Sequence, residues 1–431
     1  MIDAALLRTE QGIHTLQNSL QKRHSEPSLA NDLEKLLNER NSLTRELEDL
    51  QALRNRRSKE LGQLKAEGKE DEFNNAKEEM KTVSDQLAEL KTRHEEVEQS
   101  FSTLLSNIPN ILDERVPEGA DESHNVVVKT IGELPEFSFA PKPHYELLEN
   151  GAHIDPERGA KISGSRFIVY NEKLSKLERD LLALMLDIQI ENGYRERSVP
   201  LLVRDEAMFG TGQYPKFAEE YYRMDRDGLN LIPTGEVPLT NLFADEIIPE
   251  EDLPLCLTTQ SACFRREAGS AGKDTRGLVR VHQFMKVEIV RFTTPENSAE
   301  ELEKLTEHAG QILRALQLPY RQILLCAGDT SFSSSMTYDL EIWMPGLNRW
   351  LEISSCSNFR DFQARRAKIR VKNKETGKNT YLHTLNGSAV AAGRLLAALT
   401  EYHQTPEGGI DFDAIDAKIS KVRQLLGGKN N

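Results

Sequence analysis

The feature that most constrains this chain is a proline-free stretch between Pro27 and Pro109, in which apolar residues recur at alternating steps of three and four. This spacing is the 3.5-residue period of a coiled-coil seam, so it predicts two long helices. The segment 66–71 between them contains Gly68, and helices joined by so short a turn must run antiparallel. The expected seam positions are Leu29, Leu33, Leu36, Arg40, Leu43, Leu47, Leu50, Arg54, Arg57, Leu61 and Leu64, then Phe73, Ala76, Met80, Val83, Leu87, Leu90, His94, Val97, Phe101 and Leu104.

The end of this hairpin is basic, although the whole protein has a net charge of −14. Residues 53–69 hold six basic residues against two acidic ones, and the seam spacing puts Arg54 and Arg57 where they interrupt it. Composition alone favours a spacer or an oligomerisation element. A basic tip also suits a phosphate backbone, so we expect it to bind nucleic acid through Arg54, Arg56, Arg57, Lys59 and Lys65.

Other features of the sequence indicate the cellular compartment of the protein. No apolar run approaches the ~18 residues that a membrane span requires, so no membrane contact is expected. The start of the chain lacks the pattern of a secretory signal. The cysteines have no CxxC spacing, which argues against a disulfide framework or a cysteine-rich zinc site and favours the cytoplasm; they are Cys256, Cys263, Cys326 and Cys356.

The sequence changes character after Pro109. Residues 107–125 are rich in Pro, Asp, Glu and Asn, which is typical of a linker. We therefore expect a helical arm over 1–109 with a coiled coil at about 28–105, a linker over 110–125, and a mixed α+β domain over 126–431.

Two patches of the second domain suggest a site for a small charged ligand. Residues 231–242 place Thr234 and Glu236 around Gly235, where a ligand could approach the backbone and a carboxylate could accept from an ammonium group. The simpler interpretation of this patch is the end of a strand. In the second patch, residues 255–264 and 282–292 have the composition of strands, and the basic loop 265–280 joins them.

That loop offers a phosphate clamp. Arg265 lies at its base, where a guanidinium could hold a phosphate with two hydrogen bonds, and Gly269, Gly272 and Gly277 keep the loop pliable. An exposed basic loop is otherwise simply solvated. Phe284 on the returning strand could stack on a base, although core packing is the favoured interpretation.

Two further patches follow. Glu341 and Glu352 lie on two expected strands, and with Ser355 they offer the oxygen ligands that Mg²⁺ prefers, or else surface charge on an edge strand. Residues 386–387 are expected to form a turn, with Ser388 capping the alanine-rich helix that follows. Arg394 near the start of this helix requires an anion, either a nucleotide phosphate or a structural carboxylate.

These patches carry a resemblance to class II aminoacyl-tRNA synthetases. Arg265 and Glu267, with the hairpin and Phe284, resemble motif 2 of that class, and Gly393-Arg394 resembles motif 3. The helix near 177–192, with Pro200, resembles motif 1. Together with TGE, FRREAGSAGKDTRG, EISSCSNFRDFQARR and LNGSAVAAGR, they are similar to bacterial-type seryl-tRNA synthetases over about residues 1–410.

The resemblance implies an α+β fold: an N-terminal antiparallel helical coiled-coil arm, and a class II antiparallel β-sheet catalytic domain flanked by helices. It implies an ATP-dependent ligase that activates L-serine as seryl-adenylate and transfers it to tRNA-Ser, and also to tRNA-Sec. The implied cofactor is ATP with Mg²⁺ and no zinc. The implied assembly is a homodimer whose arm grips the long variable arm of the tRNA.

The family's site carries over residue by residue. Arg265 would hold the α-phosphate and Arg394 the γ-phosphate, Phe284 would stack on adenine, and Glu352 with Ser355 would bind Mg²⁺. The implied serine site comprises Thr234, Gly235, Glu236, Arg265, Glu288, Asn386 and Ser388. The implied ATP site comprises Arg265, Arg266, Glu267, Val281, Phe284, Glu352, Ile353, Ser354, Ser355 and Arg394.

The chain departs from the family in three places. Gly235 stands where Ala or Ser is commoner, a change that we expect to be tolerated. Met336 stands where many members have Lys, which removes one charge near the site. The tail after Ile410 does not resemble the usual ending.

Two alternative functions remain open. A related ligase could activate an amino acid and charge a carrier protein, but such enzymes are expected to lack the long basic arm. A coiled-coil scaffold with an inactive domain is disfavoured, because the motif residues Arg265, Glu267, Glu288, Glu352, Ser388 and Arg394 are all present.

Overall fold

The computed structural model describes residues 1–268 and 276–427. The chain divides into two compact units, Ile2–Ile108 and Pro109–Asn431, the latter including Met1. Gly269, Gly272 and the rest of the basic loop between residues 269 and 275 lie outside the described residues.

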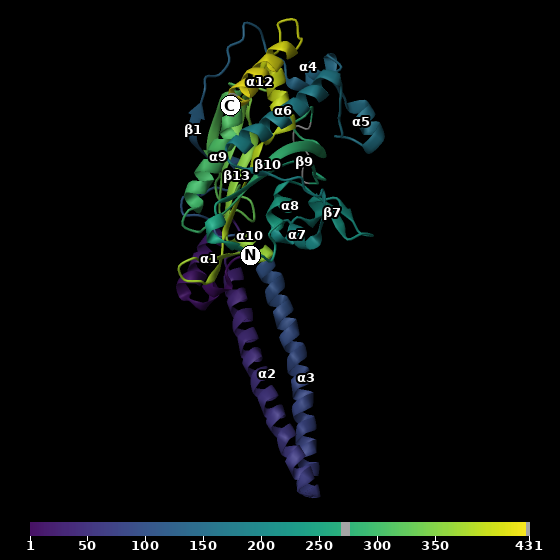
Figure 1. The fold of residues 1–431 in the computed structure, drawn as a ribbon, viewed down its shortest axis with the longest axis vertical. Helices are drawn as coiled ribbons and strands as arrows, with labels where there is room; N and C mark the ends of the chain where they lie inside the picture. Colours follow the sequence, from purple (N-terminus) through teal and green to yellow (C-terminus); the bar gives the residue numbers. More distant parts are fainter. Residues whose placement is uncertain (269–275, 428–431) are drawn as a thin grey trace. The chain divides into compact units, whose positions relative to one another are not determined.

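The first unit is helical (Figure 1), with α1 (Glu10–Lys22), α2 (Leu29–Ala66) and α3 (Glu70–Ser106). As the sequence predicts, α2 and α3 are long and pack antiparallel, joined by a tight turn in which Gly68 has a φ of 73°. Glycine adopts this left-handed conformation without steric cost. The first turn of α3 is acidic, which complements the positive end of the helix dipole.

The seam of the hairpin follows the predicted spacing only in part. Leu33 and Leu43 of α2 are buried as expected, but toward the tip Leu53 turns inward and Arg54 is exposed. A straight helix drifts from a strict 3.5-residue repeat, and the apolar neighbour takes the inner position. The prediction that Arg54 interrupts the seam is therefore wrong. Arg57 is half-buried and forms ion pairs with Glu60 (2.8 Å) and Glu79 (3.2 Å).

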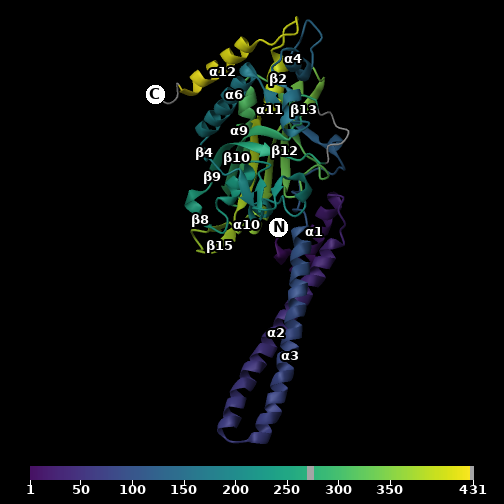
Figure 2. The same cartoon turned by 90° about the vertical axis from the view of Figure 1, so that its right-hand side faces the viewer.

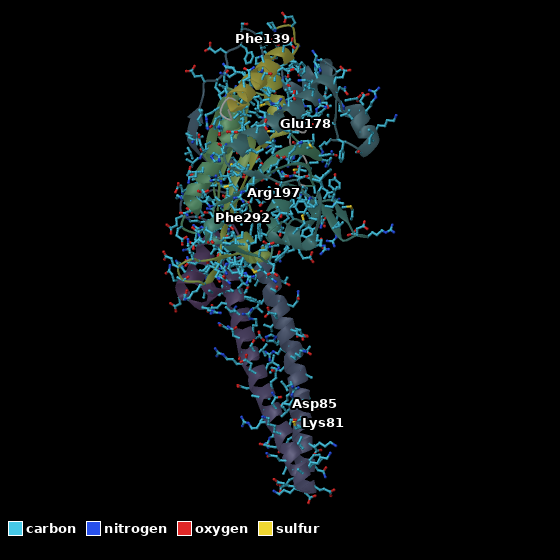
Figure 3. All side chains as sticks on the ribbon, in the orientation of Figure 1. Lys81, Asp85, Phe139, Glu178, Arg197 and Phe292 are labelled. Atoms are coloured by element: carbon cyan, nitrogen blue, oxygen red, sulfur yellow. The ribbon has the colours of Figure 1, made fainter. Side chains whose placement is uncertain are left out.

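The other faces of the two long helices are polar. Figure 3 shows charged side chains along both helices, among them Lys81 and Asp85, which are exposed. Toward the tip, the basic side chains of Arg54, Arg56, Lys59 and Lys65 are exposed as well.

The second unit is built on an eight-stranded sheet with the order β1-β11-β12-β13-β16-β10-β9-β4. All neighbours are antiparallel except β4 and β9. The strands are β1 (Val126–Ile131), β4 (Arg195–Glu196), β9 (Leu255–Phe264), β10 (Gln283–Thr293), β11 (Tyr320–Leu324), β12 (Met336–Met344), β13 (Arg349–Arg360) and β16 (His383–Ala391). The two strands predicted on either side of the basic loop are thus confirmed as β9 and β10.

Smaller sheets and helices surround this sheet. The helices are α4 (His144–Asn150), α5 (Pro156–Ser163), α6 (Glu172–Glu191), α7 (Asp205–Gly210), α8 (Glu236–Asn241), α9 (Ser298–Ala315), α10 (Phe362–Ala367), α11 (Ala392–Tyr402) and α12 (Phe412–Gly427). The small sheets are formed by β2 (Ile154–Asp155) with β3 (Val169–Tyr170); by β5 (Leu202–Arg204), β6 (Arg223–Met224) and β7 (Leu229–Leu231); and by β8 (Ile247–Pro249), β14 (Arg370–Lys372) and β15 (Asn379–Tyr381).

The main core lies between one face of the sheet and three helices, α6, α9 and α11. Alternate residues of a strand point to opposite faces, so Val287 and Ile289 of β10 enter this core. Leu340 and Ile342 of β12 enter it in the same way. The polar residues between these apolar positions consequently lie on the opposite face.

Helix α6 is apolar on more than one face, and part of this surface is covered by the end of the same chain. Helix α12 packs on α6 (Figure 2), with Ile415 and Ile419 buried in the main core. Lys176 pairs with Asp416 at 3.2 Å across this contact. Across residues 1–268 and 276–427, no helix combines the length and apolarity needed to cross a bilayer.

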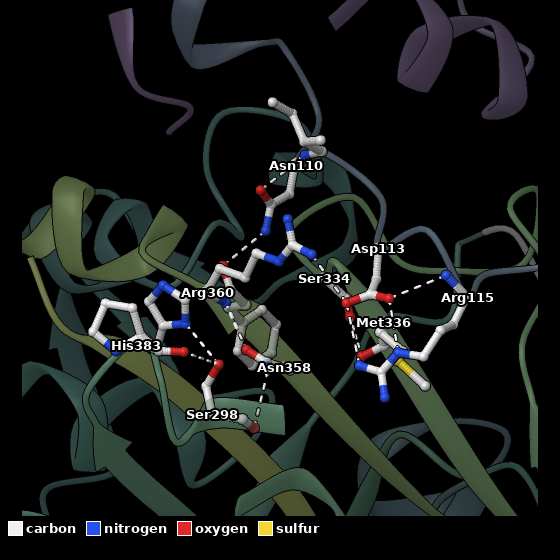
Figure 4. A network of polar contacts seen from close by, with 12 residues as sticks. Asn110, Asp113, Arg115, Ser298, Ser334, Met336, Asn358, Arg360 and His383 are labelled. Carbon is white, nitrogen blue, oxygen red and sulfur yellow. Dashed lines mark hydrogen bonds and ion pairs between the residues drawn. The ribbon is translucent and has the colours of Figure 1, made fainter. Parts of the chain in front are cut away.

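The start of the second unit is tied to the sheet by the polar network in Figure 4. The amide of Asn110 donates to Ser333 O (2.9 Å) and Phe359 O (2.8 Å). Arg360 donates to Asp113 Oδ2 at 2.9 Å. Burial works to raise the pKa of Asp113, but its bonds to Arg115 and Arg360 outweigh it and hold that pKa well below its usual range.

Candidate active site

The polar face of the central sheet carries the candidate site. On β10, Lys286 and Glu288 alternate with the core residues Val287 and Ile289, so both point away from the helices. Glu288 lies opposite Thr259 of β9 and Ser388 of β16. The fold therefore gathers polar side chains from strands that are far apart in the sequence.

Two adjoining cavities open on this face. The first, of about 520 Å³, is lined by Thr234, Glu236, Ser355, Asn386 and Ser388. The second, of about 370 Å³, is lined by Glu267, Val281, Phe284, Ile353 and Arg394. Both cavities share Arg265, Arg280, Lys286 and Glu352, besides Glu267 and Ser388.

A fully buried carboxylate, Glu288, lies behind the lining of the first cavity: it lines neither cavity itself, but its partners Thr234 and Asn386 line the first. Asn386 Nδ2 donates to Glu288 Oε1 at 2.8 Å, and Thr234 Oγ1 donates to Oε2 at 3.1 Å. Lys286 Nζ lies 2.5 Å from the same Oε2. A buried charge is stable only when paired in this way, and such a site suits a small ligand that bears an ammonium group.

A second carboxylate, Glu236, lines the first cavity itself. Glu236 begins α8, and Gln363 Nε2 donates to its Oε1 at 2.6 Å. Burial, reinforced by the charge of Glu288, raises the pKa of Glu236 to about 7. This carboxyl thus changes charge near neutral pH, which is unusual for a glutamate.

The second cavity combines an aromatic ring with two guanidinium groups. Arg265 Cζ lies 5.3 Å from the centroid of the Phe284 ring, and Arg265 Nε donates to Pro233 O at 3.3 Å. Arg394, near the start of α11, donates to Glu352 O at 2.7 Å. A ring beside two arginines can hold a planar base and its phosphates.

Carboxylates on β12 and β13 border this cavity. Burial and the charge of Glu352 raise the pKa of Asp339, whose buried Oδ1 has no hydrogen-bond partner among the described residues. Burial also works to raise the pKa of Glu352, but the charges of Arg394 and Arg265 outweigh it and lower that pKa. An unpaired buried oxygen beside Glu352 and Ser355 fits a hard cation that binds oxygen. No cluster of three or more His, Cys, Asp or Glu residues suited to a metal occurs in the part of the chain that the structure describes.

Some residues that the sequence assigned to the site line neither cavity. Arg266 is half exposed, and its backbone N–H donates to Glu220 O at 2.9 Å. Ser354 is buried and donates to Ser388 O at 2.6 Å. Gly235 lies between two lining residues and packs on Thr259. Met336 is buried in the main core, so its difference from the family alters the interior.

The prediction of a turn at residues 386–387 is wrong. Asn386 and Gly387 lie inside β16, and Ser388 pairs with Glu288 in the sheet instead of capping a helix. Helix α11 starts four residues later, at Ala392. Because β16 lies between two strands, its ladder of hydrogen bonds overrides the local turn preference of Asn-Gly.

Sequence reasoning missed three residues. Lys286 borders both cavities, and its K-x-E spacing to Glu288 on a strand was a signal that could have revealed it. Asp339 has the same two-residue spacing to Glu341. Gln363 had no local signal, because its partners Glu236 and Thr384 are distant in the sequence.

Two protein-family models match this chain. Residues 1–112 match the seryl-tRNA synthetase N-terminal domain, and residues 220–403 match the tRNA synthetase class II core domain (G, H, P, S and T). A serine–tRNA ligase of Leptospira biflexa serovar Patoc is 53% identical over 351 residues, which is 81% of this chain and 83% of that protein. One from Pseudothermotoga lettingae is 46% identical over 95% of this chain and 96% of that protein. The crystal structure of seryl-tRNA synthetase from Pyrococcus horikoshii complexed with ATP superimposes with a TM-score of 0.90 at 32% identity, covering 99% of this chain and 98% of that one.

Proposed function

Because the chain belongs to the seryl-tRNA synthetase family, we propose that its two cavities divide the activation of serine between them. The enzyme activates L-serine with ATP and charges tRNA with it. The observation that carries the assignment of the cavities is the buried Glu288, held by Thr234 and Asn386 beside a cavity that contains Phe284 and Arg265. The first cavity takes serine and the second takes ATP.

In the first cavity, Glu288 and the ionised form of Glu236 accept from the substrate ammonium. Asn386 and Ser388 offer hydrogen-bonding groups for the hydroxyl. An amino acid without the hydroxyl forfeits the bonds to these half-buried groups, a loss that can reach about 10⁴ in specificity. Threonine adds only a methyl group, which is a weaker basis for rejection.

In the second cavity, adenine stacks on Phe284, Arg265 holds the α-phosphate and Arg394 the γ-phosphate. An oxygen of the serine carboxylate bonds to the α-phosphorus as the bond to pyrophosphate breaks, which gives seryl-adenylate. The arginines neutralise the charge that develops on the phosphates, so no protein nucleophile is required. A ribose hydroxyl at the end of the tRNA then takes the seryl group and releases AMP.

Glu352 and Ser355 would hold a magnesium ion, joined by Asp339, whose unpaired oxygen lies beside them. When bound, the ion supplies positive charge to the phosphates. Glu352 and Arg394 also orient one another, because the guanidinium lies 3.3 Å from Glu352 Oε2.

The arm binds the tRNA, and its exposed tip residues Arg54, Arg56, Lys59 and Lys65 contact the backbone of the long variable arm. Arg57 contributes less, because Glu60 and Glu79 already pair with it. A ligase that charges a carrier protein has no use for such an arm.

The enzyme works as a cytoplasmic homodimer. Near β4, at one edge of the main sheet, the apolar side chains of Ile190, Leu201 and Leu202 are each more than a third exposed, which suits an interface with a second copy. A monomeric mass at micromolar concentration with full activity would contradict the dimer.

Serine-dependent ATP–pyrophosphate exchange tests the assignment of the cavities. Of the amino acids, serine alone should support exchange. Glu288→Gln should abolish exchange while the protein stays folded. Comparable exchange with serine and alanine would rule out this pocket. Charging of total tRNA with serine then separates the synthetase from a carrier ligase.

A further inference from the structure

Lys286 occupies an unusual position between the two cavities. Its side chain is only 6% exposed, yet it lines both of them. It lies on the polar face of β10, two residues before Glu288, and the pairing of β10 with β16 shifts register between these two residues. Because it lines both cavities, Lys286 can act on a ligand in either one.

The ammonium group of Lys286 is bound where a substrate ammonium is expected. Nζ lies 2.5 Å from Glu288 Oε2 and donates to Thr234 Oγ1 at 2.8 Å. A lysine side chain and an amino acid both present a primary ammonium with three donors. The pocket for the amino group is therefore filled by an equivalent group of the protein itself.

We propose that Lys286 is an internal occupant of the ammonium site, which serine displaces and which then turns toward the second cavity to contact the serine carboxylate and the α-phosphate. This inference rests on the proposed assignment of serine to Glu288. Glu288 keeps a cationic partner at every stage, which avoids the cost of an unpaired buried carboxylate. The flexible four-carbon stem of lysine permits the movement.

The exchange couples the two substrates. As long as Lys286 pairs with Glu288, its charge is directed away from the phosphates of ATP. Once a substrate ammonium takes its place, the second cavity gains a positive charge where the α-phosphorus reacts. Amino-acid binding should then tighten nucleotide binding, and the reverse must hold by the same factor.

The wild-type enzyme tests this coupling directly. Ethanolamine carries the ammonium and hydroxyl of serine without its carboxylate, and 3-hydroxypropionate carries the carboxylate and hydroxyl without the ammonium. Saturating ethanolamine should tighten the binding of α,β-methylene-ATP about fivefold or more by calorimetry, and 3-hydroxypropionate should not. An unchanged nucleotide affinity in ethanolamine overturns the proposal.

The variant Lys286→Met removes the charge and keeps the length of the side chain. Its affinity for serine alone should be unchanged or higher, because the internal competitor is gone. Its affinity for a non-hydrolysable seryl-adenylate analogue should fall about tenfold or more, and Lys286→Arg should recover part of the loss. If both affinities fall in parallel, Lys286 only supports Glu288 and the proposal is wrong.

Two further variants separate the possible failures. Arg291→Met breaks another buried ion pair of the same strand, Arg291 with Glu301 at 2.5 Å, outside both cavities. It should lower the melting temperature, but it should not change the affinity for serine relative to the affinity for the seryl-adenylate analogue. If Glu288→Gln leaves the serine affinity unchanged, the assignment of serine to Glu288 fails first; if Glu288→Gln abolishes binding while ethanolamine has no effect, only the role of Lys286 fails.

Discussion

Gln363 and Glu236 form a buried pair, in which the amide nitrogen of Gln363 donates to the carboxylate at 2.6 Å. The amide oxygen of Gln363 accepts from Thr384 Oγ1 at 2.7 Å, which fixes the orientation of the amide. The bond lowers the pKa of Glu236, but burial and the charge of Glu288 outweigh it and leave that pKa at about 7.

The use of serine should therefore depend on pH, through the ionisation of Glu236. The folded protein holds the proton of Glu236 more tightly than an unfolded chain does, so this group opposes folding as the pH rises toward 7 and above. The ionised form accepts from the substrate ammonium. Between pH 6 and pH 8 its population rises about tenfold, and kcat/KM for serine in pyrophosphate exchange should rise similarly.

Two variants check the origin of that pH dependence. Glu236→Gln should flatten the profile between pH 6 and pH 8. Gln363→Met removes the donor and should move the midpoint to higher pH. A wild-type profile that is flat across this range contradicts the role of Glu236.

The neighbouring arginines 265 and 266 offer a matched comparison. Arg265→Ala should lower the rate of pyrophosphate exchange about 10²–10³-fold, because the guanidinium that clamps the phosphate is lost. Arg266→Ala should have little effect, since its side chain lines neither cavity. Arg394→Ala should resemble Arg265→Ala and should also raise the pKa of Glu352, whose charge Arg394 compensates. Near-normal exchange in either cavity variant makes that arginine structural.

Gly235 leaves no room for a side chain. A Cβ atom there would lie 2.7 Å from Thr259 Cγ2 and 3.0 Å from Glu288 Cβ. Gly235→Ala should therefore raise KM for serine and lower the free energy of unfolding by about 1–3 kcal/mol.

A second substitution, at Thr259, should relieve that clash. Thr259→Ser removes the methyl group that Cβ meets and keeps the hydroxyl, so it should restore much of the loss in the double variant. A double-mutant cycle measures this coupling, and strictly additive effects would show that Thr259 is not the obstacle.

The arm can be tested by reversing charge at its tip. Changing Arg54, Arg56 and Lys59 to Glu should raise KM for tRNA about tenfold or more and flatten its dependence on salt, because fewer counterions are released. Serine-dependent pyrophosphate exchange should not change. As a control, the same reversal at Lys77, Lys81 and Lys91, which are exposed on α3, should affect charging much less. Equal effects of the two triple variants would mean that the tip is not a specific contact.

Periodicity predicted the parts of the fold that depend on local patterns. The long helices α2 and α3 and the strands β9 and β10 occur where the sequence places them, because each buries a face whose spacing is visible in the chain. Local preference gave the wrong structure at residues 386–387, because the hydrogen bonds of the sheet override the turn preference of Asn-Gly. It could not reveal Gln363, because that residue acts through partners more than a hundred residues away on one side and twenty on the other.

The order of strands in the main sheet has a consequence for synthesis on the ribosome. β16 lies between β13 and β10, yet it is the last of the eight strands to be made. Until residues 383–391 emerge, β13 and β10 each present an unpaired inner edge, and such edges invite pairing with other chains. Between the synthesis of β13 and that of β16, the nascent protein therefore carries two half-sheets, and Asn386 and Ser388 reach the site only when β16 joins them. A truncated chain that ends before this strand should be both inactive and prone to aggregate, which makes late termination more harmful than the small number of missing residues suggests.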